Sequence, residues 1–150
     1  MEEGLSLVSE IRKTFALPGV DVRSYSPLAL AYIGDDVYDV VVRTFVVEHA
    51  NRSAHDLHKI SSHFVKAQTQ AAMIEALEEL LTEEEEAVYK RGRNAKAYTT
   101  AKNASVADYR KETGLEALMG YLYLSDRMDR VLELMKEGFT RLELTVREGH

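Results

Sequence analysis

The chain has no cysteine, no tryptophan and only two prolines among its 150 residues. Without cysteine it has neither disulfides nor thiolate metal ligands. Its first residues lack the basic start and apolar core of a signal peptide, and no uncharged apolar run is long enough to span a bilayer. These absences predict a cytoplasmic protein of one domain, spanning residues 1–150 with its core at about 26–142, which is long enough to bury a proper core.

An excess of basic charge is also missing, because the net charge is −6. Taken alone, this value argues against a nucleic-acid partner. The charges are segregated, however. Residues 90–111 contain seven basic residues and a single acid, Asp108, a net charge of +6. Such segregation is expected of a surface with a polyanion on one side, and equally of a solvated basic loop.

Helical start signals recur along the chain and predict an all-helical fold. A first amphipathic helix is outlined by Leu5, Val8, Ile11, Arg12 and Phe15. After a loop over residues 16–23, Ser26 is expected to cap a helix with Pro27 at its first position, running to about His49. The valine-rich half of this segment also has strand propensity, but its length and apolar character favour a central buried helix.

The second half of the chain repeats these signals. Ser53 is expected to begin one long helix from about Ala54 to Leu81, and Thr82 a short helix ending near Gly92, with residues 93–104 as a loop. Ser105 opens a further helix, and Ser125 or Asp126 caps the last one. The apolar stripe of that last helix comprises Met128, Val131, Leu132, Met135, Phe139 and Leu142.

Carboxylates inside apolar runs are the most informative feature of the chain. Asp35 lies in the run from Ser26 to Asp39, and Glu116 lies in a second run from Thr113 to Tyr123. Because an unpaired buried charge is unfavourable, such acids indicate a metal, a proton relay or a buried ion pair. Two carboxylates on two apolar helices are the ligands that a hard cation needs.

Two glycines suggest how these acids meet. Gly34 precedes Asp35, and Gly120 lies one turn after Glu116. Glycine inside a helix is unfavourable by about 1 kcal/mol relative to alanine, and its use is to let another backbone pass closely. Two helices that cross at these glycines would bring Asp35 and Glu116 together.

The segment Ala31-Tyr-Ile-Gly-Asp-Asp-Val-Tyr38 resembles the ribonuclease III signature, and Glu116-Ala-Leu-Met-Gly-Tyr-Leu-Tyr123 resembles the second catalytic segment of that family. The run Arg91-Gly-Arg-Asn-Ala-Lys96, with the stretch from Tyr109 to Tyr123, is similar to the short bacterial branch called Mini-ribonuclease III. The resemblance extends from about Ser26 to the last helix, with the three motifs in order.

The resemblance implies an all-α endonuclease domain that acts as a homodimer on double-stranded RNA with Mg²⁺, for which Mn²⁺ substitutes. Asp35 and Glu116 fall on catalytic, metal-binding positions, and Tyr32 falls on the dimer contact. The implied substrate is the precursor of large-subunit (23S) ribosomal RNA, with a ribosomal protein as a possible helper. The implied reaction is hydrolysis of a phosphodiester by water that the metal activates, leaving 5′-phosphomonoesters and short 3′ overhangs. Larger relatives append a double-stranded-RNA-binding domain, for which this chain leaves no room.

The chain departs from longer ribonucleases III at two positions. Those proteins carry acids where this chain has Ala31 and Thr113, so a site of four carboxylates is reduced to two. The short branch shares this reduction. Mg²⁺ accepts few protein ligands because it keeps its waters and uses substrate phosphates, so a site of two carboxylates completed by RNA is reasonable.

Substrate binding is expected from the basic segment. Duplex RNA is recognised mainly by shape, through phosphates and 2′-hydroxyls. The expected contacts are Arg91, Arg93, Asn94, Lys96 and Lys102. A weaker set of candidates, which a solvated helix face explains equally well, comprises His55, His58, Lys59 and Lys66.

Three other interpretations remain open. A metal phosphohydrolase of the His-Asp type would use His49, His55, Asp56, His58 and His63, although these residues are too closely spaced along the chain for such a site. A helical dimer could bind RNA or ribosomes without cutting. Finally, the acids could be ordinary surface residues, an interpretation that suits Asp36 and Asp39 better than Asp35.

Overall fold

The computed structural model describes residues 6–95 and 105–146. Within these ranges the chain is helical and contains no strand, which confirms the all-α prediction. The elements are, in order, α1 (Leu7–Thr14), η1 (Val22–Ser24), α2 (Pro27–His49), α3 (Ala54–Val65), α4 (Ala67–Leu77), η2 (Glu78–Leu80), α5 (Glu83–Asn94), α6 (Val106–Leu124) and α7 (Met128–Arg141). None of the helices in the described part is long and apolar enough to cross a membrane.

The predicted helix starts are confirmed at four places. Ser26, Ser53 and Ser105 each accept a hydrogen bond from the backbone N–H three residues later, at 3.0–3.2 Å. Thr82 forms a reciprocal capping box with Glu85. These side chains satisfy N–H groups that have no partner inside the helix, and each cap stabilises its helix by about 1 kcal/mol.

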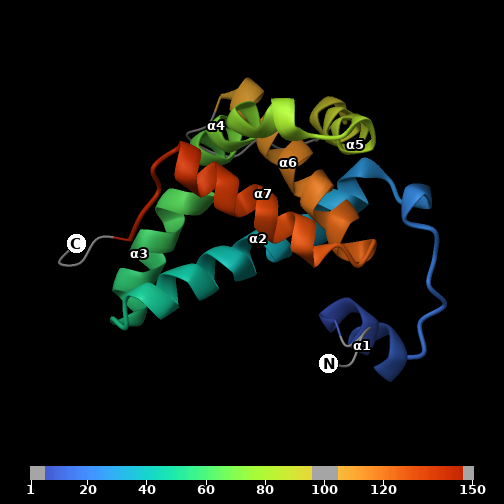
Figure 1. The fold of residues 1–150 in the computed structure, drawn as a ribbon, viewed down its shortest axis with the longest axis horizontal. Helices are drawn as coiled ribbons and strands as arrows, with labels where there is room; N and C mark the ends of the chain where they lie inside the picture. Colours follow the sequence, from blue (N-terminus) through green and yellow to red (C-terminus); the bar gives the residue numbers. More distant parts are fainter. Residues whose placement is uncertain (1–5, 96–104, 147–150) are drawn as a thin grey trace.

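The long helix α2 and the helix α6 form the centre of the bundle, and α4, α5 and α7 pack around them (Figure 1). The valine-rich half of α2 is helical, as predicted, and Val42 and Val46 are fully buried in it. The largest fully buried side chains come from all the central helices: Tyr38, Tyr89, Phe64, Leu30, Met73, Ile74, Leu77, Leu115, Leu118, Met119, Leu122 and Leu134.

The prediction of one helix from Ala54 to Leu81 is wrong. The chain is extended at Lys66, where α3 ends and α4 begins, and α4 ends at Leu77 before the short 3₁₀ helix η2. Side chains bind the last carbonyl groups of α3: Tyr38 donates to Phe64 (2.9 Å), Thr69 to His63 (2.7 Å) and Gln70 to Val65 (2.8 Å). Because these carbonyls are satisfied from outside the helix, the break leaves them paired.

Three smaller expectations are also corrected. Arg93 and Asn94 belong to the last turn of α5 and not to a loop. The N-cap of α7 is Arg127 and not Ser125 or Asp126, because Ser125 ends α6 and Asp126 takes a left-handed φ of 59° in the turn. On α7, Leu132 is 49% exposed, and Leu134 is buried in its place.

Helix α1 lies at one edge of the bundle (Figure 1). Arg12 of α1 donates a hydrogen bond of 2.7 Å to the carbonyl of Leu124, which attaches α1 to the end of α6. Val8 of α1 is buried. The rest of the predicted apolar stripe that the structure describes is largely exposed, with Phe15 at 69%. The loop that follows ends in η1, whose N-cap is Asp21.

Candidate active site

The centre of the molecule is a close crossing of α2 and α6 at two glycines. A Cβ atom on Gly34 would overlap the carbonyl oxygen of Glu116 and lie 2.8 Å from the backbone nitrogen of Gly120. A Cβ atom on Gly120 would overlap the carbonyl oxygen of Leu30. The two helices therefore touch through their main chains, as the glycine pattern predicted.

This crossing brings Asp35 and Glu116 together. Asp35 directly follows Gly34 on α2, and Glu116 is the residue whose carbonyl oxygen faces Gly34. The two carboxyl groups interact, because a hydrogen bond between them lowers the pKa of Asp35 and raises the pKa of Glu116. Asp35 is exposed and Glu116 is half-buried, so that the pair has one face open to solvent.

A third carboxylate, from Glu112, joins this pair. It lies one turn before Glu116 on α6, and its charge raises the pKa of Glu116. The family pattern does not predict Glu112, because it has its acid at the position of Thr113. Thr113 is buried, and its hydroxyl donates to the carbonyl of Tyr109 at 3.0 Å. The spacing of four residues between Glu112 and Glu116 was the available signal, because residues four apart share a helix face.

Burial is the main cause that raises the pKa of all three acids. Burial raises the pKa of Glu116 to about 9, and the charges of Glu112 and Asp35 raise it as well. Burial, followed by the charge of Asp35, raises the pKa of Glu112 to about 7. Burial also raises the pKa of Asp35, although the hydrogen bond from Glu116 opposes this shift. The protein alone therefore holds protons where a bound cation would favour ionised carboxylates.

This proton uptake predicts how stability depends on pH without metal. The folded-state pKa of Glu116 lies above its ordinary value of 4.5, so the folded protein holds a proton that the unfolded chain releases. The resulting stabilisation is complete below the unfolded pKa and is lost as the pH rises towards 9. At pH 8.5, the Tm of Glu116→Gln should be about 4 °C or more above that of wild type. Each kcal/mol of unfolding free energy shifts the Tm of a domain of this size by roughly 2–4 °C.

Thermal melts in EDTA at pH 5.5 and 8.5 check this prediction. Glu48→Gln, at an exposed position of α2, is the matched control and should follow the wild-type curve. If the Tm fell by the same amount between pH 5.5 and pH 8.5 in wild type and in Glu116→Gln, Glu116 would not be the group that takes up the proton.

The donor set suits Mg²⁺. Carboxylate oxygens are the hard ligands that this ion prefers, and it commonly binds one or two of them together with waters and substrate phosphates. Across residues 6–95 and 105–146, no group of three or more His, Cys, Asp or Glu side chains is placed to hold a metal ion. Asp35 and Glu116 provide such oxygens, and their clustered negative charge is what a cation would neutralise.

The basic segment begins beside these acids. The added Cβ of Gly92, in the last turn of α5, would lie 2.7 Å from the Cβ of Ala117 and 3.0 Å from the Cα of Gly114. These contacts pack the last turn of α5, which carries Arg91 and Arg93, against the helix α6 that carries Glu116. Arg91 is exposed.

Arg93 is held in place by its neighbours. Its Nε donates to the side-chain oxygen of Asn94 at 3.2 Å, and its guanidinium lies 5.6 Å from the centre of the Tyr89 ring. The two other predicted contacts, Lys96 and Lys102, lie outside the described residues.

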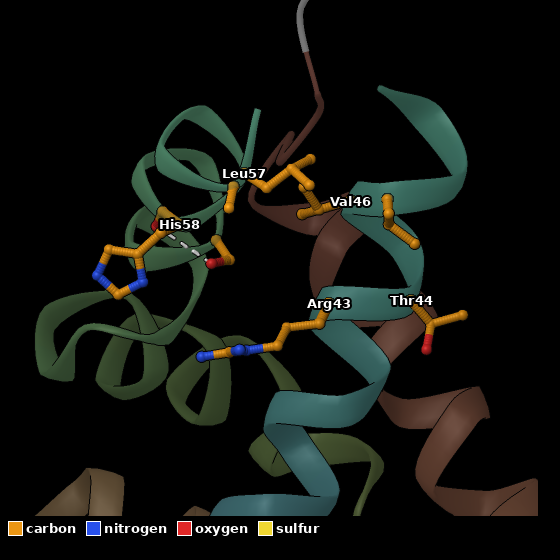
Figure 2. A pocket seen from close by; sticks show the side chains of 8 residues that line it. Arg43, Thr44, Val46, Leu57 and His58 are labelled. Atoms are coloured by element: carbon orange, nitrogen blue, oxygen red, sulfur yellow. Dashed lines mark hydrogen bonds between the residues drawn. The ribbon is translucent and has the colours of Figure 1, made fainter. Parts of the chain in front are cut away.

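A second cationic region lies between α2 and α3. A pocket of about 400 Å³ is lined there by Arg43, Thr44, Val46, Val47, Ala54, Leu57, His58 and Ser61. Figure 2 shows Arg43 extending from α2 towards α3, on the side of the pocket where His58 lies. The weaker contact candidates His55, His58, Lys59 and Lys66 are all exposed. Of these, the structure places only His58 at this pocket.

The other acids and the histidines do not join the candidate site. Asp39 forms an ion pair with Arg43 at 3.0 Å, and Asp36 is exposed. The ring of His49 lies against Phe45, 4.3 Å between centroids, and its Nδ1 is 2.8 Å from the Phe45 carbonyl oxygen. The structure therefore lends no support, in the part of the chain that it describes, to a His-Asp metal centre.

Tyr32 is the most exposed large apolar residue among those described, at 83%. Leu28, one turn earlier on α2, is 39% exposed, and Val40, two turns later, is 55% exposed. These apolar side chains lie on one side of the central helix, with the exposed Asp36 between Tyr32 and Val40.

The chain is similar to several known proteins. The family model described as the ribonuclease III domain matches residues 28–127. A protein of Enterococcus faecalis named Mini-ribonuclease 3 is 46% identical over 117 residues, which cover 77% of this chain and 89% of that protein. A Mini-ribonuclease 3 of a Thermoanaerobacter species is 41% identical over 131 residues, covering 87% and 92%. A crystal structure of a Fusobacterium nucleatum protein is similar with a TM-score of 0.71 at 28% identity, covering 77% of this chain and 93% of that one.

Proposed function

This chain belongs to the ribonuclease III family, in its Mini-ribonuclease III branch, and from that premise we propose its substrate, metal and catalytic residues. The chain is an endoribonuclease of the ribonuclease III type. We propose that it cleaves double-stranded RNA in the presence of Mg²⁺, in the maturation of the 23S ribosomal RNA precursor.

The observation that carries the proposal is the meeting of Asp35 and Glu116 at the crossing of α2 and α6. The two residues are 81 positions apart in the sequence, and only the glycine crossing brings their carboxylates together. Such a pair of acids with raised pKa values is unfavourable for stability unless a bound cation uses it.

In the proposed mechanism, Asp35 and Glu116 hold the metal ion. Mg²⁺ bound there would lower the pKa of an attacking water and neutralise the scissile phosphate. The chain itself orients the reaction. The main-chain contact at Gly34 fixes how closely α2 and α6 approach beside Asp35 and Glu116, and the contact at Gly92 fixes the end of α5 against α6.

Substrate binding is assigned to Arg91, Arg93 and Asn94 at the end of α5, with Lys96 and Lys102 in the segment that follows. Their positive charge and hydrogen-bonding groups suit phosphates and 2′-hydroxyls, through which proteins recognise the shape of an RNA duplex. Because α5 packs against α6, which carries Glu116, we propose that a duplex bound to these groups also reaches the two acids.

The proposal includes a homodimer that forms through the exposed apolar face of α2, with Tyr32 at its centre. Burying a ring that is 83% exposed would remove a large apolar surface from water. A dimer would place one site on each strand of a duplex, from which short 3′ overhangs follow. A ribosomal protein that presents the RNA precursor would be a further partner.

The deciding experiment is cleavage of end-labelled RNA by the purified protein. We expect it to cut duplex RNA, including a stem of the 23S precursor, only with Mg²⁺ and not with EDTA. Single-stranded RNA and duplex DNA should remain intact under the same conditions.

Binding of the duplex without any cleavage, with and without Mg²⁺, would contradict the proposal. It would favour the second candidate, a non-catalytic dimer that binds RNA or ribosomes, for which the neutral residues Ala31 and Thr113 are the supporting observation.

A further inference from the structure

Gln70 is the buried polar residue nearest to the acids. It is the fourth residue of α4 and only 1% exposed. Its side-chain nitrogen Nε2 lies 2.8 Å from the carbonyl oxygen of Val65, 3.3 Å from Oε2 of Glu112 and 3.4 Å from Oε2 of Glu116. An amide nitrogen has two hydrogens, so the shortest contact takes one of them and the two carboxylates share the other.

The amide binds two groups that repel each other. The carboxylates of Glu112 and Glu116 are both within hydrogen-bonding distance of the same nitrogen, although their charges raise each other's energy in a half-buried site. A lysine or arginine at position 70 would neutralise the pair and compete with a cation. A neutral amide holds both carboxylates in place and leaves their negative charge available to a metal.

The break between α3 and α4 sets the direction of this amide. Val65 is the last residue of α3, and its carbonyl faces Gln70 because Lys66 is extended. Turning the amide over would place its oxygen against the Val65 carbonyl and both carboxylates, which would be repulsive. The hydrogen bonds thus determine which end of the amide points to the acids.

In this orientation, the amide oxygen of Gln70 has no hydrogen-bond partner among the described residues. Oε1 of Gln70 is a buried atom for which the described part of the chain provides no hydrogen bond. An unpaired buried oxygen is destabilising, and it needs an explanation. Methionine would fill the same volume without that oxygen, so the amide is explained by what its nitrogen does.

We propose that Gln70 is a positioning residue of the active site: its amide nitrogen binds the carboxylates of Glu112 and Glu116 together and so holds Glu116 opposite Asp35. The role is to orient a metal ligand through a hydrogen bond, not to touch the substrate. The proposal rests on the proposed function, in which Asp35 and Glu116 bind the metal.

The test compares Gln70→Met, which removes the donor and keeps the size, with wild type. Mn²⁺ binding is measured by electron paramagnetic resonance without RNA, and kcat and KM are measured on duplex RNA. Hydrogen-bond partners of metal ligands typically contribute tenfold to a hundredfold, so we expect Mn²⁺ affinity and kcat each to fall about tenfold or more. The KM for RNA should stay unchanged. The Tm is measured as well, because Gln70→Met removes both the unpaired oxygen and the hydrogen bond to the Val65 carbonyl.

Two further variants complete the experiment. Gln70→Glu adds a third repelling carboxylate and should lower kcat at least as far as Gln70→Met. Gln68→Met controls for the loss of a glutamine amide from an exposed position in the same turn of α4.

The proposal is overturned if Gln70→Met binds Mn²⁺ and cuts as wild type does. It is also overturned if Gln70→Met loses activity together with Tm and saturating Mn²⁺ recovers none of it, because Gln70 would then have a structural role. Asp35→Asn is assayed alongside to separate the two proposals. An active Asp35→Asn protein would refute the assigned acids, whereas normal Gln70→Met beside inactive Asp35→Asn refutes the role of Gln70 alone.

Discussion

Asp35→Asn is expected to abolish cleavage of duplex RNA and to leave the RNA bound. Asparagine has the shape of aspartate but lacks the negative charge, so Glu116 would be the remaining carboxylate of the pair. Charge stabilisation by a bound metal contributes several kcal/mol to such reactions, and each 1.4 kcal/mol changes the rate about tenfold. The rate constant measured with saturating RNA and Mg²⁺ should therefore fall about a thousandfold or more.

Asp36→Asn is the matched control for this substitution. It removes the same charge from the next residue of α2, whose side chain is exposed. We expect it to cut within about threefold of wild type, since it leaves the pair of acids intact. Gel-shift assays in EDTA should give the same RNA affinity for all three proteins. Cleavage by Asp35→Asn at the rate of Asp36→Asn would remove Asp35 from the mechanism.

Gly34→Ala adds one methyl group and is expected to lower the free energy of unfolding more than Gly138→Ala does. The new Cβ would overlap the carbonyl oxygen of Glu116 and approach the backbone nitrogen of Gly120 to 2.8 Å. Both obstacles belong to the main chain, which has no rotamer to change, so α2 and α6 must separate along their whole contact. Overpacking typically costs 1–3 kcal/mol where side chains can adjust. Here we expect about 3 kcal/mol or more, a fall in Tm of roughly 10 °C.

Gly138→Ala is the control for the higher helix propensity of alanine, which favours both substitutions by about 1 kcal/mol. The nearest atoms to its new Cβ are Cγ and Sδ of Met73, at 2.7 and 2.9 Å, and they belong to a flexible side chain. Thermal melts should therefore show a much smaller loss for Gly138→Ala. A Gly34→Ala protein as stable as wild type would mean that the helices do not cross as closely as described.

The helix starts and the central crossing could be predicted because their signals are local or periodic. Ser26 with Pro27, Ser53, Thr82 and Ser105 each mark a helix start by a side chain that binds the backbone three residues later. Gly34 indicates a close contact because glycine has no other advantage inside a helix.

The features that the sequence did not predict depend on distant partners. The break at Lys66 contains neither proline nor glycine. It is stabilised by Tyr38, which comes from another helix, and by side chains of α4 that bind back to α3. The exposure of Leu132 likewise depends on which helices α7 meets. Glu112 differs from these features, because its spacing of four residues from Glu116 is a local signal. The family pattern does not include it, since that pattern has its acid at the position of Thr113.

The main-chain contact at Gly34 and Gly120 makes the spacing of the two acids independent of the surface that would bind RNA. The approach of α2 and α6 at Asp35 and Glu116 is determined by backbone atoms, whereas the surface that we propose to contact RNA begins at the end of α5. Surface residues at the end of α5 can therefore be exchanged without moving the catalytic pair. A library that varies Arg91 and Arg93 is thus a suitable starting point for changing which duplex is cut, while the chemistry stays the same.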